Sequence, residues 1–295
     1  MSAGGAVGAI ELGGTKILCR VTASTGEVLA QERFVTSTPA QALADLGGCL
    51  GRAQAAARIG ALGVASFGPI DVDPGSRHYG RMLATPKPGW SGFDVRGGLA
   101  ALLAVPIRLD TDVNAAALAE GHLGAGRGCR SLAYVTVGTG IGAGLVTQGE
   151  TLRGVLHPEL GHLKLARRAG DAHPSTCPFH ADCVEGLAAG PAVARRVGAR
   201  ASLECAPRDF GYVAGYLGEL AAAVVLAWAP HRLVFGGGVM AVPGLLERTG
   251  QALRDTLNGY GPPVAREPGY LVAAELQDAG LEGALLMARA ALAPP

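Results

Sequence analysis

Two stretches of the chain share one pattern, in which an apolar run is broken by glycines and then resumes. The first is VGAIELGGTKILCRVTA, broken at Gly13 and Gly14, and the second is SLAYVTVGTGIGAGLVTQGE around residue 140. Apolar runs on both sides of a tight glycine turn are typical of a β-hairpin. Each copy is followed later by a helical segment. The repetition therefore predicts two related α/β lobes with a ligand-binding cleft between them.

The intervening segments alternate between helical and strand-like patterns. Helical periodicity covers residues 42–59, and GALGVASFGPID (60–71) is a short strand that ends in a Gly-Pro loop. A helix, the strand IRLD (107–110) and a helix from about Asp112 to Gly124 come next. After the second hairpin, the pattern predicts an Ala-rich helical region, the strand RLVFGGGV (232–239) and two closing helices.

The bulk properties narrow the class of protein. The chain has 295 residues, which favours two lobes, and its formal net charge of +1 gives no electrostatic reason to bind nucleic acid or an anionic membrane. The longest apolar run, residues 220–230, is shorter than the ~20 residues that span a bilayer, so it predicts a buried helix. Residues 1–14 lack a basic segment, so no secretory signal is expected. We therefore expect a cytoplasmic protein with reduced cysteines.

Two glycine-rich turns are candidates for phosphate binding. GGTK (Gly13–Lys16) combines bare backbone N–H groups with a hydroxyl and an ammonium, although a plain hairpin turn explains it as well. GTGIGAG (138–144) has more glycines than a turn requires. A dinucleotide-binding motif needs a helix directly after its glycines, whereas the β-like LVTQGE follows here. A phosphate-binding hairpin is therefore favoured over a nicotinamide site.

A pair of acidic residues and a third glycine cluster add to this picture. Asp110 and Asp112 lie where a strand gives way to a helix, so helix capping explains one of them. Beside two phosphate loops, a carboxylate that accepts a hydroxyl proton during phosphoryl transfer becomes the better explanation. FGGGVM (235–240) offers a flat surface for a nucleotide base or ribose, or is simply a strand-to-helix corner.

The segment STCPFHADCVEG contains three metal-ligand side chains, Cys177, His180 and Cys183. The C-x-x-C spacing of a redox pair is absent, and a disulfide is disfavoured in a reducing compartment. Zinc accepts mixed thiolate and imidazole ligands and closes a structural site at four. A fourth ligand from nearby is expected, with His157, His162 and His173 as the alternatives.

Several stretches, in this order, resemble the ROK family of sugar kinases over roughly residues 7–290, and its bacterial fructokinase branch most closely. They are ELGGTK, SFGPID, TPKPGW, DTDVNAAALAE, GTGIGAG, HPELGH, CPFHADCVEGLAAGP and VFGGGVM. The resemblance implies an α/β, two-lobed actin-like (ribonuclease H-like) ATPase fold with an interlobe active-site cleft. It implies a first lobe at residues 1–114, on which a C-terminal helix at residues 280–295 packs. The second lobe, residues 115–279, contains the zinc-binding loop.

The resemblance also implies transfer of the γ-phosphate of ATP to fructose by a cytoplasmic homodimer, with catalytic Mg²⁺ and structural Zn²⁺. Asp112 matches the catalytic base, and Glu159 and His162 match an E-x-G-H element that contacts the sugar. The implied nucleotide-binding residues are Gly13, Gly14, Thr15, Lys16, Gly138, Thr139, Gly140, Gly142, Gly236, Gly237 and Gly238. The implied substrate-binding residues are Gly68, Pro69, Thr111, Asp112, Glu159 and His162, and the implied zinc ligands are His162, Cys177, His180 and Cys183.

Three departures from the wider family point to the fructokinase branch. Glu11 stands where the wider family commonly has Asp, Thr111 where it has Asn, and His180 where its metal loop has a cysteine. The alternatives are a ROK kinase for glucose, mannose or an amino sugar, and a non-catalytic sugar-binding regulator of the same fold. Selectivity between epimeric hexoses depends on a few hydrogen bonds that a sequence does not reveal.

Overall fold

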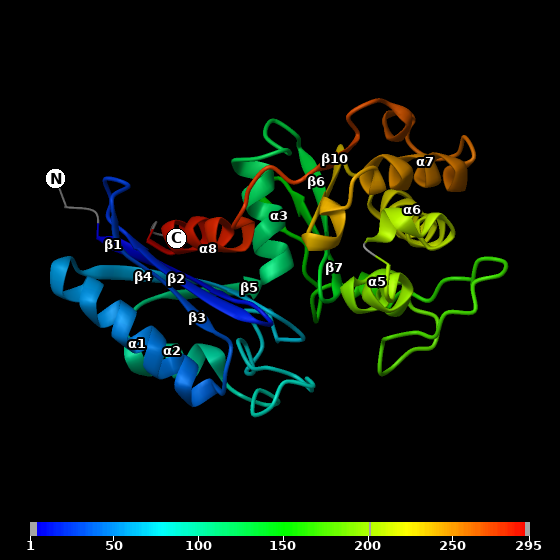
Figure 1. Cartoon of the computed structure of the whole chain (residues 1–295). Helices are drawn as coiled ribbons and strands as arrows, with labels where there is room; N and C mark the ends of the chain where they lie inside the picture. Colours follow the sequence, from blue (N-terminus) through cyan, green and yellow to red (C-terminus); the bar gives the residue numbers. More distant parts are fainter. Residues whose placement is uncertain (1–4, 201, 293–295) are drawn as a thin grey trace. The chain divides into compact units, whose positions relative to one another are not determined.

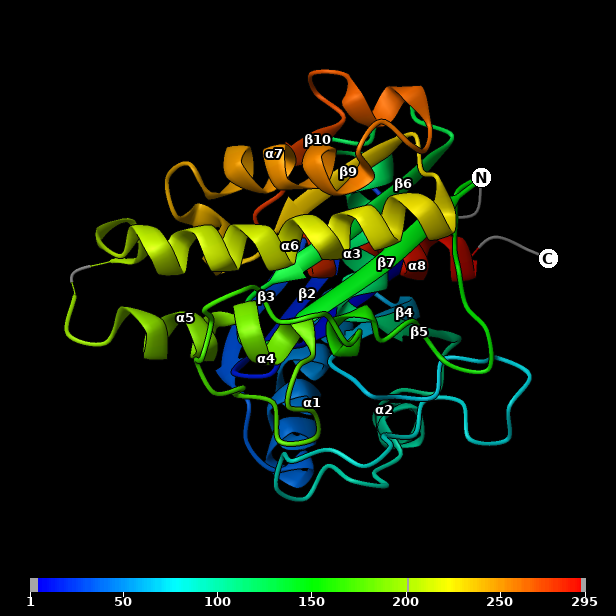
Figure 2. The same ribbon diagram turned by 90° about the vertical axis from the view of Figure 1, so that its right-hand side faces the viewer.

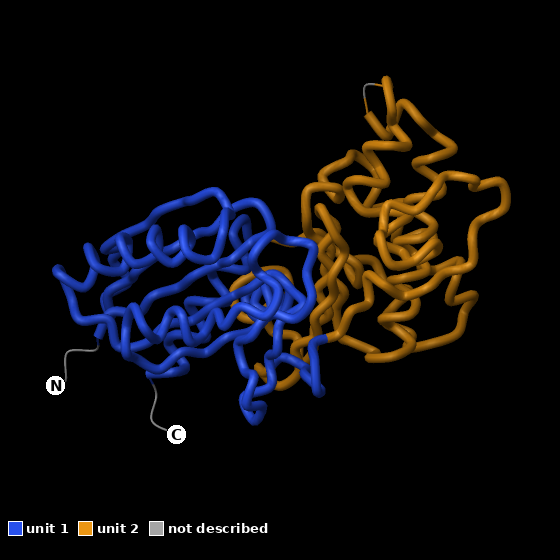
Figure 3. Tube along the Cα trace, turned by 90° about the horizontal axis from the view of Figure 1, so that it is seen from below, with its two compact units in different colours: residues 1–119, 151–157, 276–295 blue, residues 120–150, 158–275 orange. Residues whose placement is uncertain are grey.

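The computed structural model describes residues 5–200 and 202–292. The chain contains two five-stranded sheets and forms two compact units, which Figure 3 shows in different colours. The first comprises residues 1–119, 151–157 and 276–295, and the second comprises residues 120–150 and 158–275. The boundary inferred from the family resemblance, between residues 114 and 115, stays a prediction.

The sheet of the first unit has five strands in the order β3-β2-β1-β4-β5. The expected hairpin is present, because β1 and β2 pair antiparallel with Leu12 opposite Ile17. β4 and β5 then run parallel to β1, so three strands end at the same edge. The strands are β1 (Ala6–Leu12), β2 (Lys16–Thr22), β3 (Val28–Val35), β4 (Ile59–Ser66) and β5 (Ile107–Thr111).

Helices cover both faces of this sheet (Figure 1). α1 (Pro39–Ala56) and α2 (Val95–Leu102) pack on one face, and α8 (Ala279–Leu292) packs on the other. α1 begins where Thr38 accepts a hydrogen bond from the Gln41 N–H and proline occupies the first turn, a favourable helix start. The predicted C-terminal helix 280–295 corresponds to α8, and residues 293–295 lie outside the described residues.

The second unit repeats the strand order of the first. Its sheet runs β10-β9-β6-β7-β8, so a hairpin is again followed by two parallel strands added beside its first strand. This equivalence confirms the two related α/β lobes predicted from the repeated strand–glycine–strand pattern. The strands are β6 (Ser131–Val137), β7 (Ile141–Thr147), β8 (Glu150–Thr151), β9 (Arg232–Gly236) and β10 (Leu271–Ala273).

The helices of the second unit include the long α6 (Pro207–Trp228) with α7 (Leu245–Leu257) packed along it (Figure 2). In the described part of the chain, α6 alone is long and apolar enough to cross a membrane. However, 61% of its 18-residue apolar window is buried, as the sequence predicted for a core helix. The remaining elements are α3 (Asp112–His122), α4 (Val184–Ala188), α5 (Gly190–Val197) and 3-10 turns at Leu160–His162, Leu203–Cys205, Gly238–Ala241 and Pro263–Arg266.

The contact between β4 and α8 leaves no space for a side chain at Gly63. A Cβ atom there would lie 1.8 Å from the carbonyl oxygen of Ala284 and 2.8 Å from the backbone nitrogen of Ala288. Because backbone atoms cannot rotate away, we expect Gly63→Ala to lower the free energy of unfolding by about 3 kcal/mol. Urea denaturation at a constant m-value measures this change.

Gly51 provides the matched control, because it lies within α1 and an added Cβ there would meet no atom within 4 Å. Gly51→Ala should raise the free energy of unfolding by about 1 kcal/mol through helix propensity. Equal changes in the free energy of unfolding of the two variants would contradict the packing explanation.

Candidate functional site

The candidate residues of the first unit gather at the carboxyl edge of its sheet. Leu12, the last residue of β1, pairs with Ser66, the last of β4, and Ser66 pairs with Thr111, the last of β5. The segments that leave these strands therefore start side by side. They are the first glycine turn (residues 13–15), the Gly68–Pro69 loop and the start of α3 at Asp112. In α/β sheets, ligands bind outside the carboxyl ends of the strands.

The first glycine turn keeps two of its N–H groups available, because only the Gly13 N–H is used within the turn, by donation to the Lys16 carbonyl at 2.9 Å. The carbonyls of Gly13 and Thr15 accept hydrogen bonds from the hydroxyl and the backbone N–H of Thr36, at 2.7 and 3.0 Å. Among residues 5–200 and 202–292, none accepts from the N–H groups of Gly14 or Thr15, and both residues are exposed. Lys16 begins β2, and its ammonium lies 3.3 Å from Asp278. Exposed N–H donors beside an ammonium suit an anionic ligand.

The two aspartates at the end of β5 have different environments. Asp110 is 1% exposed, and its carboxylate accepts hydrogen bonds from the side chains of Asn114 and Thr151, both at 2.7 Å. Asp112 is half-buried at the first position of α3 and accepts from the Val113 N–H at 2.9 Å. The hydroxyl of Thr111 caps the helix by accepting from the Asn114 N–H at 3.1 Å. The alternative explanation, in which helix capping accounts for one aspartate, is therefore not needed, because the Thr111 hydroxyl accepts the N–H that a cap would accept.

The candidate residues of the second unit also lie at a carboxyl edge. β6 ends at Val137, and its residue Thr136 pairs with Gly236 at the end of the parallel strand β9. The second glycine turn (residues 138–140) leads directly into β7, which contains Gly142, so no helix follows the glycines. This confirms a hairpin rather than a dinucleotide-binding motif. Gly237 and Gly238 form the corner from β9 into a 3-10 turn.

The E-x-G-H segment packs tightly against the second hairpin. A Cβ atom at Gly161 would lie 1.9 Å from the carbonyl oxygen of Ile141, so only glycine allows this approach. The 3-10 turn Leu160–His162 fixes the segment, and the His162 N–H donates to the Glu159 carbonyl at 3.0 Å. Glu159 and His162 are thus held beside the start of β7.

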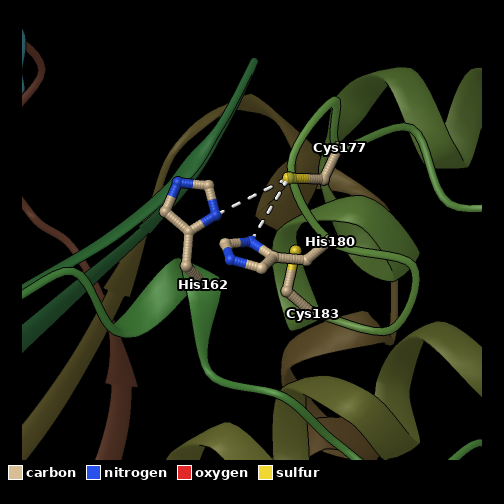
Figure 4. Close-up of side chains that lie close together, drawn as sticks. All are labelled: His162, Cys177, His180 and Cys183. Atoms are coloured by element: carbon tan, nitrogen blue, oxygen red, sulfur yellow. Dashed lines mark hydrogen bonds between the residues drawn. The ribbon is translucent and has the colours of Figure 1, made fainter. Parts of the chain in front are cut away.

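Four ligand side chains converge in the second unit, as Figure 4 shows. The ligand atoms of His162, Cys177, His180 and Cys183 all lie within 4.8 Å of one another. The Cys177 sulfur is 3.7 Å from Nδ1 of His162 and 3.7 Å from Nδ1 of His180. We refer to these four residues as the Cys/His cluster.

The donor set and its spacing fit a structural zinc ion. Tetrahedral zinc with Zn–S bonds of about 2.3 Å and Zn–N bonds of about 2.0 Å requires ligand atoms roughly 3.5 Å apart. The 3.7 Å separations agree with this value. Both sulfurs also accept backbone N–H groups, Cys177 from Phe179 and Cys183 from Gly186, each at 3.4 Å. Such outer hydrogen bonds stabilise thiolate ligands.

The other two histidines considered as a fourth ligand have different surroundings. His157 belongs to the first unit, where its buried ring accepts a hydrogen bond from the Ile70 N–H at 3.4 Å, next to the Gly68–Pro69 loop. The ring of His173 lies 3.2 Å from the Pro174 carbonyl. The structure therefore brings His162 into the cluster and gives His157 and His173 other contacts.

Glu185 is a site residue that the sequence interpretation missed. Its carboxylate accepts a hydrogen bond from the Ile141 N–H at 2.9 Å and lies 3.9 Å from Nε2 of His162. It therefore links the second glycine turn to the Cys/His cluster. The available signal was a carboxylate two residues after Cys183, and a spacing of two carries little information without the tertiary structure.

A second carboxylate accompanies Glu185. The Glu159 side chain is solvent-accessible but crowded by protein atoms, and this partial burial, reinforced by the negative charge of Glu185, raises the pKa of Glu159 to about 7. Two carboxylates and an imidazole thus lie close to one another beside the second hairpin. Such a group offers several hydrogen-bond acceptors to a polyhydroxylated ligand.

Comparison with known proteins agrees with these features. The family model described as "ROK family" matches residues 7–291. A fructokinase of Pediococcus pentosaceus is 38% identical over 97% of this chain and 98% of that protein. A fructokinase of Zymomonas mobilis is 37% identical, covering 96% of each chain. The ROK hexokinase of Thermus thermophilus has a TM-score of 0.77 at 33% identity, covering 97% of this chain and 98% of the other.

These matches cover both hairpins, the Cys/His cluster and both sheets, and they confirm the expected two-lobed α/β kinase fold. A model match across nearly the whole chain, together with relatives above 30% identity at full length, leads to one conclusion: the chain belongs to the ROK family.

Proposed function

We propose that this protein phosphorylates D-fructose with MgATP and releases fructose 6-phosphate and ADP. The observation that carries the proposal is the register of β1, β4 and β5. Because of this register, the first glycine turn, the Gly68–Pro69 loop and the helix that begins at Asp112 all leave the sheet at the same edge. A phosphate-binding turn and a carboxylate at one edge are the two parts that phosphoryl transfer to an alcohol requires. The full-length relatives named fructokinase support the choice of sugar.

In the proposed step, Asp112 accepts the proton of the fructose 6-hydroxyl while the oxygen of that hydroxyl attacks the γ-phosphorus of ATP. The new O–P bond forms as the bond between the γ-phosphorus and the β,γ-bridging oxygen breaks, and ADP leaves with that electron pair. The residues of the first glycine turn hold the phosphates through the N–H groups of Gly14 and Thr15. Thr111 fixes the start of α3 and hence the position of Asp112.

In the same proposal, the second unit supplies nucleotide and sugar contacts. The second glycine turn holds phosphate oxygens, and the exposed corner at Gly237 and Gly238 accepts the adenosine, while the buried Gly236 packs against Tyr134. Glu159 accepts hydrogen bonds from sugar hydroxyls, and the His162 ring forms a hydrogen bond with a sugar hydroxyl. The Cys/His cluster would hold a structural Zn²⁺, which cross-links the segment 177–183 to His162 when bound.

A hexose panel tests the function. Coupled assays with MgATP and fructose, glucose, mannose or N-acetylmannosamine should give kcat/KM for fructose at least about 10-fold above the others. Mass spectrometry and NMR should identify fructose 6-phosphate as the product. A higher kcat/KM for another hexose would mean that this hexose, and not fructose, is the substrate. Binding of sugar without any phosphorylation would support the alternative of a non-catalytic regulator.

A further inference from the structure

The chain contains three lysines, and two of them lie at the first glycine turn. One is Lys16, which belongs to the turn motif itself. The other is Lys87, which comes from the distant segment TPKPGW (residues 85–90), a motif to which the function proposed above gives no role. Its ammonium donates a hydrogen bond to the Gly14 carbonyl.

The TPKPGW segment is firmly anchored within the first unit. The Trp90 side chain is 2% exposed and packs edge-on against Phe67 and Phe93, with ring centroids 5.2 and 5.7 Å away. Its indole N–H donates to the Ser37 carbonyl at 2.8 Å. Prolines on both sides of Lys87 restrict the backbone further. The segment therefore presents Lys87 from a fixed position.

The two lysines differ in charge compensation. The ammonium of Lys16 is 3.3 Å from the Asp278 carboxylate, which offsets part of its charge. Within the described chain, the ammonium of Lys87 meets only the Gly14 carbonyl and the face of the Phe67 ring, whose centroid is 5.6 Å away. A lysine ammonium has three N–H donors, so donation to Gly14 leaves two for a ligand.

We propose that Lys87 is a catalytic residue that binds the γ-phosphoryl group of ATP and stabilises its charge during transfer. This inference rests on the proposed kinase function. Next to the open N–H groups of Gly14 and Thr15, an uncompensated ammonium recognises phosphate oxygens as a point charge. Lys87 keeps its protons throughout, because Asp112 takes the proton of the sugar hydroxyl. Preorganised positive charge of this kind acts on the transition state.

The test compares Lys87→Met and Lys87→Arg with the matched control Arg81→Met. Arg81 is an exposed cation of the same loop region that donates to the Gly92 carbonyl at 2.9 Å. We expect Lys87→Met to lower kcat about 10²-fold with fructose, Lys87→Arg to restore part of it, and Arg81→Met to leave it unchanged. Calorimetric titration should show weaker binding of a non-hydrolysable ATP analogue by Lys87→Met and unchanged binding of ADP.

Three results would overturn the inference. They are an unchanged kcat, a parallel loss of ADP affinity, or equal losses in both Lys87 variants together with a lower melting temperature, which would indicate a structural role. If the unaltered protein phosphorylates no hexose, the proposed function fails. The difference between ATP-analogue and ADP binding still decides the role of Lys87.

Discussion

Replacing Asp112 by Asn is expected to lower kcat about 10³-fold while leaving nucleotide binding within about twofold of the unaltered protein. The amide is nearly the same size as the carboxylate and keeps an oxygen that can accept the Val113 N–H, so α3 should begin as before. It cannot accept the proton of the sugar hydroxyl. Steady-state kinetics with fructose and calorimetric titration with ATP measure the two effects separately.

Asp94 offers a matched control for this substitution. It precedes α2 and caps that helix by accepting a hydrogen bond from the Gly97 N–H at 2.7 Å. Asp94→Asn makes the same chemical change at a helix start outside the proposed site and should retain kcat. If Asp112→Asn instead lost nucleotide binding and stability together, Asp112 would be a folding residue and the proposed mechanism would be wrong.

The sequence was most informative where the structural signal is local. Both hairpins were predicted, because apolar runs that flank glycines fix their strands and turns without reference to the rest of the chain. The edge strands β3 and β10 were not predicted. β3 alternates between exposed and half-buried side chains, so it lacks the apolar run that marks a buried strand. β10 has three residues within the apolar stretch YLVAA, which is too short to distinguish a strand from a buried helix segment.

Features that depend on pairing between distant segments do not follow from the residue patterns, although the family resemblance assigned the first glycine turn, the Gly68–Pro69 loop and Asp112 to one site. The common edge formed by Leu12, Ser66 and Thr111 results from the parallel register of strands far apart in the sequence. Glu185 and Lys87 reach their glycine turns through tertiary packing, across 44 residues in the first case and 73 in the second. Their neighbouring residues do not reveal these contacts. The Cys/His cluster is intermediate, because three ligands are close in sequence and His162 joins them through the fold.

Removing one ligand of the Cys/His cluster should have the second large effect on activity. The Cys177 sulfur lies 3.7 Å from a ring nitrogen of His162 and 3.7 Å from one of His180. Cys177→Ser removes this sulfur ligand, so both histidines should be held less firmly in the cluster. His162 adjoins Glu185, which holds the Ile141 N–H at the second glycine turn. We therefore expect loss of bound zinc and a decrease in kcat/KM of about 10-fold to 100-fold.

Zinc analysis by plasma mass spectrometry and kinetics with fructose test this expectation. We expect one zinc per chain in the unaltered protein and far less in Cys177→Ser. Cys205→Ser is the matched control, because Cys205 is an exposed cysteine outside the cluster that accepts a hydrogen bond from the Ser202 hydroxyl at 3.7 Å. It should keep both zinc and activity. A chelator that strips zinc should reproduce the loss, because the ion would cross-link Cys177, His180 and Cys183 to His162. Full activity of zinc-free protein would contradict this role and show that the hairpin and the E-x-G-H segment hold their positions without the metal, through the Gly161–Ile141 contact and the Glu185 hydrogen bond.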